Sequence, residues 1–368
     1  MTQTDSLRIG VVGAGGICRS RHLPHLARID GVAVVAVCNR TRRSAERVAD
    51  AFDIPEIETD WQRLVDRPDL DAVFIGTWPY MHQEVSVAAL EAGKHVFCQA
   101  RMARDLAEAR AMCDAADRRP ALVNMLCPPP HRMPFEDLIQ DLVASGELGR
   151  IAAVQLVSVN NAALTSDRLS WREDVGYSGK QVMAVGIYAE TLNAWLGPYE
   201  RLSAEFAQVI ETKRDEAGRE VPLTLPQTVS IHGRLDRGAT INELHCSAAA
   251  GPPGGDWLAI GGTEASLHYR IMSDRIEIAR RGGEREPLPI PSGHPLAVND
   301  AWQVEQTFVA AVRAARAGEP PERRRVSPDF AEGLEYMRKV EAVHRSAEQG
   351  RPVPLAEVGR VAGGQGGR

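Results

Sequence analysis

Glycines follow directly after the first apolar segment of the chain, in a pattern suited to binding phosphate. Residues 7–12 predict a buried strand, and a glycine-rich turn that opens a helix comes at once after them. Glycine at position 13 permits a tight turn, and glycine at position 15 lets the backbone approach a pyrophosphate, which helix amides attract. A purely structural turn is the alternative, because Cys18 holds a position usually taken by Gly or Ala. The candidate cofactor-binding residues here are Gly13, Gly15, Gly16 and Ile17.

The end of the next apolar strand, predicted over residues 32–37, bears on the choice of cofactor. It lies roughly 20 residues beyond the glycines, as in dinucleotide-binding folds, where an Asp or Glu would bind the adenosine ribose and repel a 2′-phosphate. This chain has Asn39 instead, followed by Arg40 and Arg43. Arginine forks suit phosphate oxygens, so the sequence favours NADP slightly over NAD. The alternative is that Arg42 and Arg43 only decorate the next helix.

A third buried strand is predicted over residues 72–77, so it ends at Thr77 and is followed by Trp78 and His82. Because ligands of open α/β sheets bind beyond the carboxyl ends of the strands, we expect these three residues near the nicotinamide. For His82 the alternative is a residue at a helix N-terminus that faces water.

The segment from Gly93 to Ala103 carries the most informative departure from a known pattern. With the preceding turns, it resembles the glucose-fructose oxidoreductase and inositol dehydrogenase (Gfo/Idh/MocA) family, over most of the chain. In that family the segment typically ends in Glu-Lys-Pro, and the Lys reaches both the cofactor and the reacting hydroxyl. Here it reads Gln99-Ala100-Arg101, so a charged donor is absent from that position. The resemblance implies a cofactor contact for Gln99.

A second region, residues 178–197, resembles the family but differs at its catalytic positions. The family shows Asp, His and Asp where this chain has Ala184, Tyr188 and Thr191. Tyr188 is therefore a candidate donor to a carbonyl oxygen, or a base if a nearby cation lowers its pKa. For Lys180, an exposed loop lysine is the alternative. The candidate catalytic residues are Tyr188, Lys180 and Arg101.

Three further residues are candidates for contact with substrate. His131 lies near a position where many family members carry Arg, although a simple loop residue fits equally well. Helical spacing places residues 184, 188, 191 and 195 on one face and residues 183, 186, 190 and 193 on another. Glu190 would then pair with a cation in the interior or at a subunit interface. The candidate substrate residues are His131, Trp171 and Arg172.

The elements that must position these residues predict an α/β fold with two domains. Residues 1–127 predict a Rossmann dinucleotide-binding domain, and the prolines at 128–130 interrupt regular structure at its end. Residues 128–355 predict a substrate-binding and oligomerisation α+β domain with a large, mostly antiparallel open sheet. Two helices, near 301–317 and 328–348, close this domain, and residues 356–368 predict a flexible tail.

Composition narrows the class of protein. With 368 residues and 44% hydrophobic content, the chain can bury two ordinary cores. A formal net charge of -6 gives no basic footprint for nucleic acid, and no apolar run reaches the ~20 residues of a membrane span. Six cysteines without a Cys-x-x-Cys pair fit a reducing cytoplasm. Motifs for metal-dependent hydrolysis, serine nucleophiles and ATP hydrolysis are missing, and we predict no metal site.

These patterns predict an NAD(P)-dependent oxidoreductase with an atypical catalytic centre, which transfers a hydride to or from a sugar, cyclitol or related polyhydroxy compound. The resemblance implies this substrate class and a homodimer or homotetramer. Loss of a side-chain base costs typically 10²–10⁴-fold, or ~3–5 kcal/mol, so redox chemistry is weakened and not forbidden. Two alternatives are a catalytically silent cofactor-binding or regulatory protein, and an enzyme that uses transient oxidation for elimination, epimerisation or glycosidic cleavage.

Overall fold

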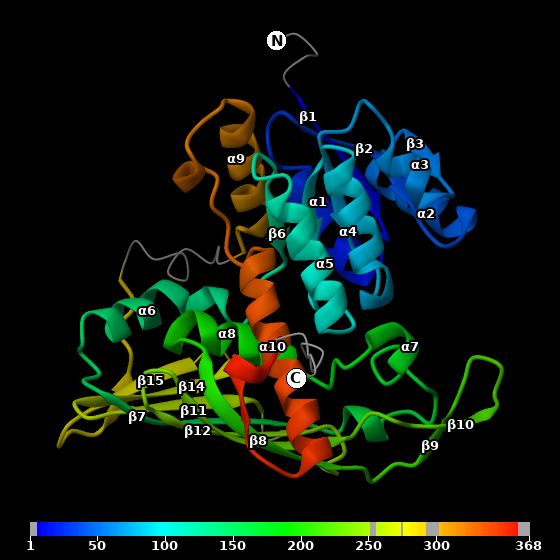
Figure 1. Cartoon of the computed structure of the whole chain (residues 1–368). Coiled ribbons are helices and arrows are strands. Elements are labelled where there is room, and N and C mark those ends of the chain that lie inside the picture. Colours follow the sequence, from blue (N-terminus) through cyan, green and yellow to red (C-terminus); the bar gives the residue numbers. More distant parts are fainter. Residues whose placement is uncertain (1–5, 251–254, 274, 292–301, 360–368) are drawn as a thin grey trace, which may run out of the picture. The chain divides into compact units, whose positions relative to one another are not determined.

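A computed structural model of the chain describes residues 6–250, 255–273, 275–291 and 302–359 (Figure 1). The chain forms two compact units: residues 1–128 with 303–334, and residues 129–302 with 335–368. The structure therefore differs from the expected division, because residues 303–334 belong to the first unit and not to the second. Of the expected tail, residues 360–368 lie outside the described part of the chain, and Leu355–Glu357 form a short 3₁₀ helix.

Within its described residues, the first unit is built on a parallel sheet with the strand order β3-β2-β1-β4-β5-β6. This is the strand order of the dinucleotide-binding Rossmann fold. The order in which strands are added to the sheet reverses between β1 and β4, and this place is called the switch point. The apolar β1 is central and pairs with β2 and β4. The strands are β1 (Leu7–Val12), β2 (Val32–Cys38), β3 (Glu56–Glu58), β4 (Ala72–Ile75), β5 (His95–Cys98) and β6 (Asn124–Leu126).

Helices connect these strands, and several begin at side-chain caps. Thr41 and Asp105 accept hydrogen bonds from the amides three residues ahead, as N-caps do. Strand β6 begins only at Asn124, because the Leu122 amide donates to the Arg119 carbonyl in a turn before it. The helices are α1 (Leu23–Leu26), α2 (Arg42–Phe52), α3 (Trp61–Val65), α4 (His82–Glu91) and α5 (Leu106–Asp117).

Helix α9 (Val304–Arg316) joins the first unit through its aromatic and acidic side chains. Phe308 packs edge-on against Phe74 and Phe97, at centroid distances of 5.2 and 5.8 Å. The carboxylate of Glu305, which is fully buried, accepts a hydrogen bond from His22 of the first helical segment. These contacts are the physical reason why the segment does not belong to the second unit. A composition-based boundary at 128–130 cannot reveal them.

Within its described residues, the second unit contains a nine-stranded sheet with the order β16-β15-β14-β13-β7-β12-β11-β8-β17. Only β7 and β12 are parallel neighbours in it, and the other pairs are antiparallel, which confirms the predicted open sheet. The strands are β7 (Ile151–Val159), β8 (Tyr199–Ala207), β11 (Thr228–Leu235), β12 (Thr240–Cys246), β13 (Trp257–Gly262), β14 (Ala265–Arg270), β15 (Arg275–Arg280), β16 (Arg285–Pro287) and β17 (Val353–Pro354). Strands β9 (Thr212–Arg214) and β10 (Glu220–Pro222) form a separate hairpin.

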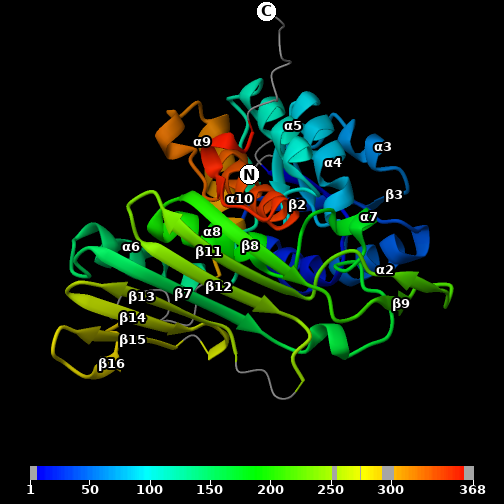
Figure 2. The ribbon, with the colours of Figure 1, turned by 60° about the horizontal axis from the view of Figure 1, so that its bottom comes forward.

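Helices cover one face of this sheet. Figures 1 and 2 show α6 (Glu136–Ala144) and α8 (Val185–Leu196) on the same face, with α7 (Val175–Ser178) beyond them. Helix α10 (Phe330–Gln349) contributes its residues from 335 onward to this unit. Helix α8 begins only after Ala184, and Met183 has a left-handed φ of 46°, so the expected helical face that included residue 183 starts too early. No helix among the described residues combines the length and the apolar content needed to cross a bilayer.

Candidate functional site

The glycine-rich turn after β1 is in direct contact with the end of β4. Gly13 has a φ of 85°, and a β-carbon there would lie 2.5 Å from Cγ2 and 2.6 Å from the backbone nitrogen of Thr77. A β-carbon at Gly76 would lie 2.2 Å from the sulfur of Cys18. Both positions therefore require glycine, because only glycine avoids these clashes, and at Gly13 glycine also reaches the left-handed φ at low cost. The two strand ends on either side of the switch point thereby meet.

The helix after the turn begins at an open position. Gly16 and Ile17 are its first helical residues, and a β-carbon at Gly16 would have no atom within 4 Å. The next residues, Cys18–His22, form a π-helical turn, a feature often found at functional sites. Since the first amides of a helix lack intrahelical partners and favour anions, this end suits a pyrophosphate.

A cavity of about 500 Å³ lies at the carboxyl ends of β1, β2 and β4, where the fold predicts a dinucleotide. Thr77 Oγ1 is buried there and has no hydrogen-bond partner among the described residues, so the cavity wall offers a polar atom to a ligand. Of the predicted residues, the wall contains Gly13, Gly15, Asn39, Arg40, Thr77 and Trp78. It also contains residues that the sequence did not reveal, among them Arg19, Ser44, Arg47, Trp61, Tyr80 and Met81. The predicted residues Gly16, Ile17, Arg43, His82 and Gln99 are not part of the wall.

Asn39 shapes the cavity from the end of β2. Its Oδ1 accepts a hydrogen bond from the Ala14 amide at 2.7 Å, and its Nδ2 donates to the Ser44 carbonyl at 3.2 Å. The residue at the usual ribose-binding position thus holds the glycine turn to the start of α2. A neutral amide at this point leaves the adenosine end of the cavity without a carboxylate.

Cations line the cavity, whereas none of the described residues in its wall is Asp or Glu. Arg40 and Arg47 lie at the β2 end, and Arg19 lies on the first helix. The nearby carboxylates have other partners: Glu58 lies 3.8 Å from Arg67, and Asp60 caps α3. Arg42 pairs with Glu46 on the surface, which fits the alternative that this arginine belongs to the exposed face of the next helix. The described part of the cavity wall therefore carries positive charge and no acidic side chain.

His82 lies inside the fold and not in the cavity wall. It is fully buried, and its ring nitrogens lie 2.8 Å from the Arg101 carbonyl oxygen and 3.0 Å from the Thr77 carbonyl oxygen. Burial lowers the pKa of His82, although these carbonyls oppose the effect. The expected cofactor contact is therefore corrected, because His82 connects the segments after β4 and β5. Neither the water-facing alternative nor a direct ligand role fits its burial.

The side chain of Gln99 also forms its hydrogen bond inside the protein. Its Nε2 lies 2.5 Å from Nε2 of His22, whose other nitrogen contacts Glu305. Because the amide nitrogen can only donate, His22 accepts at Nε2 and donates from Nδ1 to the carboxylate. This buried chain explains why Gln99 does not reach the cavity. Arg101 is 7% exposed and follows a cis peptide bond after Ala100.

In the second unit, Tyr188 of α8 donates a hydrogen bond to the carboxylate of Asp256, which also accepts one from Ser158 at 3.0 Å. Burial and the Asp256 charge raise the pKa of Tyr188 well above its usual range. The hypothesis of a tyrosine base whose pKa is lowered by a cation is therefore wrong, since the group beside the phenol is an anion. Tyr188 remains available as an oriented hydroxyl.

Lys180 has a partner elsewhere. Its Nζ donates to Glu341 of α10 at 2.7 Å, its carbonyl accepts from His344 at 2.8 Å, and its side chain is 37% exposed. The role of a cation acting on Tyr188 is thus not supported. Trp171 and Arg172 lie in a loop, where the guanidinium carbon of Arg172 is 4.4 Å from the ring centroid of Trp171.

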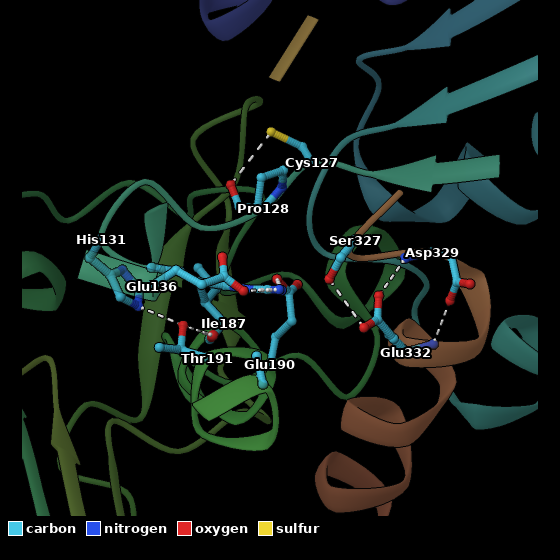
Figure 3. Close-up of polar contacts among 12 residues, drawn as sticks. Cys127, Pro128, His131, Glu136, Ile187, Glu190, Thr191, Ser327, Asp329 and Glu332 are labelled. Atoms are coloured by element: carbon cyan, nitrogen blue, oxygen red, sulfur yellow. Dashed lines mark hydrogen bonds and ion pairs between the residues drawn. The ribbon is translucent and has the colours of Figure 1, made fainter. Parts of the chain in front are cut away.

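His131 joins Tyr188 on the helix side of the second unit. Its ring lies 4.6 Å from the Tyr188 ring, and its Nε2 donates to Thr191 Oγ1 at 3.0 Å, while that hydroxyl donates to the Ile187 carbonyl (Figure 3). Burial and the adjacent Arg132 charge lower the pKa of His131 to about 3, so the ring is neutral. The structure thus brings together two predicted residues, His131 and Tyr188, with Thr191.

Glu190 pairs with a buried cation, as its position on α8 predicts. Its Oε1 lies 3.0 Å from Arg132, which also contacts Glu136 at 2.6 Å, and both carboxylates are visible in Figure 3. Arg132 is 2% exposed, so two carboxylates compensate a buried guanidinium.

Several polar residues of the second unit escaped the sequence analysis. They are Ser158, Glu243, His245 and Asp256, contributed by β7, β12 and the residue before β13. Ser158, Glu243 and His245 have one sequence signal: each is a polar residue at a strand position whose side chain faces the otherwise apolar side of the sheet. Asp256 follows a Gly- and Pro-rich stretch and carries no signal in the sequence.

A Rossmann sheet with a glycine turn at its switch point, followed by a large open sheet, defines a two-domain dinucleotide-binding oxidoreductase. Residues 7–126 match the model of an oxidoreductase family with an NAD-binding Rossmann fold, and residues 137–268 match the GFO/IDH/MocA C-terminal domain. The chain therefore belongs to the Gfo/Idh/MocA family, and the resemblance noted from its motifs is confirmed.

Comparisons with individual proteins agree with membership of this family. The chain is 29% identical over 368 residues to an uncharacterized oxidoreductase of Rhizobium meliloti, which covers 94% of this chain and 98% of that protein. It is 25% identical to levoglucosan dehydrogenase of Pseudarthrobacter phenanthrenivorans, over 96% and 99% of the two chains. A solved structure of levoglucosan dehydrogenase with NADH and L-sorbose has the same fold, with a TM-score of 0.83, 22% identity and coverage of 95% and 99%.

Proposed function

We propose that this protein is an oxidoreductase that uses NADP(H) in preference to NAD(H) and acts on a sugar or a related polyhydroxy compound. The observation that carries the cofactor preference is the wall of the cavity at the ends of β1, β2 and β4. That wall combines Arg40 and Arg47 with Asn39 at the β2 end, and it contains no carboxylate among the described residues. When bound, the nicotinamide cofactor would supply or accept the hydride.

The residues of the first unit fit each part of such a cofactor. The turn at Gly15 and the amides that follow would bind the pyrophosphate, because no side chain fills the space beside them. The unpartnered hydroxyl of Thr77 offers a hydrogen bond on the β4 side of the cavity. Arg40 and Arg47 would bind the 2′-phosphate through their guanidinium groups.

The proposed substrate class rests on relatives and on the polar cluster of the second unit. Levoglucosan dehydrogenase, by its name, oxidises an anhydrosugar, and the chain matches it along its whole length. Tyr188, Ser158, Asp256 and His131 bring hydroxyls, a carboxylate and an imidazole together, as recognition of several hydroxyl groups requires. These observations support a polyhydroxy substrate.

Titration of the purified protein with NADPH and NADH, followed by nucleotide fluorescence, tests the cofactor preference. We expect Arg47→Gln to weaken NADPH binding about 10–100-fold, which corresponds to ~1.4–2.8 kcal/mol, and to change NADH binding much less. Arg43→Gln is the matched control, because this arginine is exposed on the same helix but is not part of the cavity wall. Tighter binding of NADH than of NADPH by the unmodified protein rejects the preference.

The substrate class is tested with NADP⁺ and a panel of anhydrosugars, free sugars, cyclitols and sugar acids, beginning with levoglucosan and L-sorbose. We expect reduced cofactor to appear with at least one member of the panel. Failure to bind either nucleotide contradicts the proposed function as a whole. Tight nucleotide binding without turnover of any compound would instead identify a silent cofactor-binding protein.

We also propose that a second copy of the chain covers the outer face of the sheet of the second unit. This face carries small residues such as Ala153, Ala259 and Gly261, and Leu244 is 38% exposed. Sedimentation analysis at micromolar concentration tests the proposal, and a monomer would contradict it.

A further inference from the structure

His245 and Glu243 form a hydrogen-bonded pair on the inner face of β12. The Nε2 atom of His245 lies 3.0 Å from Oε2 of Glu243, and both side chains are buried. A carboxylate oxygen only accepts, so Nε2 carries the proton and the lone pair of the neutral ring is on Nδ1. This is the arrangement by which an acidic residue orients a histidine that acts as a base.

The Nδ1 atom of His245 has no hydrogen-bond partner among the described residues, although the side chain is 0% exposed. Leaving a buried acceptor unsatisfied costs about 1–3 kcal/mol, so such an atom in a folded protein requires an explanation. The simplest one is a ligand that donates a hydrogen bond there. A hydroxyl group of a polyhydroxy compound is such a donor.

The surroundings of His245 are those of a site for hydroxyl groups. Ser158 on β7 is its register partner in the parallel pair, and the Tyr188 ring lies 5.8 Å from its ring. The hydroxyls of Ser158 and Tyr188 both donate to Asp256, so neither satisfies Nδ1. His131, which is neutral, packs on the far side of Tyr188.

Glu243 is held in its charged form behind the imidazole. Burial by itself would raise the pKa of Glu243, but the charge of Lys339 and the hydrogen bonds from His245 and Lys339 outweigh it and lower the pKa to about 2. Lys339 Nζ lies 2.5 Å from Oε1, which also accepts a hydrogen bond from Tyr199. An ionised carboxylate in this place stabilises an imidazolium formed at His245.

We infer that His245, oriented by Glu243, is the general acid–base group for the substrate hydroxyl, an inference that rests on the proposed function. When bound, the nicotinamide cofactor would accept the hydride that the substrate carbon loses in oxidation. The hydroxyl proton moves to Nδ1 of His245 as the carbonyl double bond forms, and reduction reverses each step. Tyr188 then orients the substrate and does not take the proton.

Kinetics with the fastest substrate of the panel test this role. His245→Gln keeps a donor for Glu243 and removes the base, so kcat is expected to fall about 10²–10⁴-fold while the Kd of NADPH stays within about twofold. His232→Gln is the matched control, because His232 is exposed on the neighbouring strand β11 and bonds Asn242. A His245→Gln enzyme with kcat within about threefold of the parent overturns the inference.

The charge on Glu243 gives a second readout. Glu243→Gln removes the anion that orients His245 and stabilises an imidazolium, so we expect the acidic limb of the kcat profile to shift and its plateau to fall. The double variant E243Q/K339M removes both buried charges and keeps the test available if E243Q does not fold. An acidic limb that stays in place in the folded variant contradicts a role in proton transfer.

The protonated nitrogen can be observed without any substrate. Nitrogen-15 spectra of protein labelled in its histidine rings, with the His245 signals assigned by their loss in His245→Gln, are expected to show the Nε2–H form at pH 8. A proton on Nδ1 overturns the inference. Because this measurement needs neither turnover nor cofactor, its failure is distinguishable from failure of the proposed function.

Discussion

The Oδ1 atom of Asn39 accepts the amide hydrogen of Ala14 at 2.7 Å, which fixes the residue after β2 to the glycine turn after β1. One amide side chain thus sets both the shape of the turn and the charge of the adenosine end of the cavity. An aspartate has the same size and keeps the acceptor for Ala14, but it loses the donor to the Ser44 carbonyl, so comparing NADPH with NADH is what separates the charge effect from a change in the turn.

Asn39→Asp is expected to weaken NADPH binding by about tenfold or more, equivalent to ~1.4 kcal/mol, because a carboxylate at this point repels the 2′-phosphate. NADH lacks that phosphate and should bind with nearly unchanged affinity. Parallel fluorescence titrations with the two nucleotides provide the measurement. Equal weakening of both would show that the substitution damages the turn and that the charge does not set the preference.

The two glycines of the turn are expected to respond differently to alanine. Gly13→Ala forces a methyl group against the Thr77 backbone at a left-handed φ, so the free energy of unfolding should fall by about 3 kcal/mol or more. At Gly15 the nearest atom to an added β-carbon is 3.9 Å away, and the residue lines the cavity. Gly15→Ala should therefore fold normally and bind nucleotide more weakly. Denaturant unfolding and nucleotide titration of both variants test this, and a Gly15→Ala protein with full affinity would contradict the placement of the pyrophosphate.

Tyr188→Phe separates a positioning hydroxyl from a base. Since the phenol donates to Asp256 and its pKa is raised, we expect kcat to fall by less than about tenfold and the acidic limb of the pH profile to stay in place. The loss of a hydrogen bond to a charged group should lower the free energy of unfolding by about 1.5–3 kcal/mol. Steady-state kinetics and urea unfolding test both parts. Loss of the pH limb in this variant would return the role of base to Tyr188.

Acid should destabilise the first unit through His95. The ring Nδ1 accepts the Val123 amide at 2.9 Å, and burial lowers the pKa of His95 to about 4. The unfolded ring has a pKa near 6.5 and binds a proton first as the pH falls, so stability is complete above about pH 6.5 and decreases toward pH 4. At pH 5 the loss amounts to about 2 kcal/mol.

His95→Asn keeps an acceptor for Val123 and cannot be protonated. Its free energy of unfolding should therefore change less between pH 7.5 and pH 5 than that of the unmodified protein. Urea unfolding at the two pH values supplies the comparison. Equal losses in both proteins would show that His95 is not responsible.

The sequence signals for the cofactor region are local. The strand at residues 7–12, the glycines after it and Asn39 are fixed by spacing along a short stretch of chain, and the structure brings them to one cavity. The proposed acid–base site is different. His245, Ser158 and Asp256 meet through the register of β7 with β12 and β13, and no local pattern encodes that register.

Buried partners explain the remaining differences. Gln99 and His82 occupy positions where the family pattern implied ligand contact, yet each is bonded inside the fold, to His22 and to backbone carbonyls. The partner that completes the Gln99 chain, Glu305, is separated from His22 by 283 residues. A motif shows which residue type occupies a position, whereas its hydrogen-bond partner depends on the assembled fold.

Because residues 303–334 belong to the first unit, that unit is completed late during synthesis of the chain. Phe308 and Glu305 cover Phe74, Phe97 and His22, all of which leave the ribosome much earlier. Until α9 is synthesised, an apolar patch and a histidine on the first unit remain exposed to water. The nucleotide-binding half is thus the first to be translated and among the last to be completed.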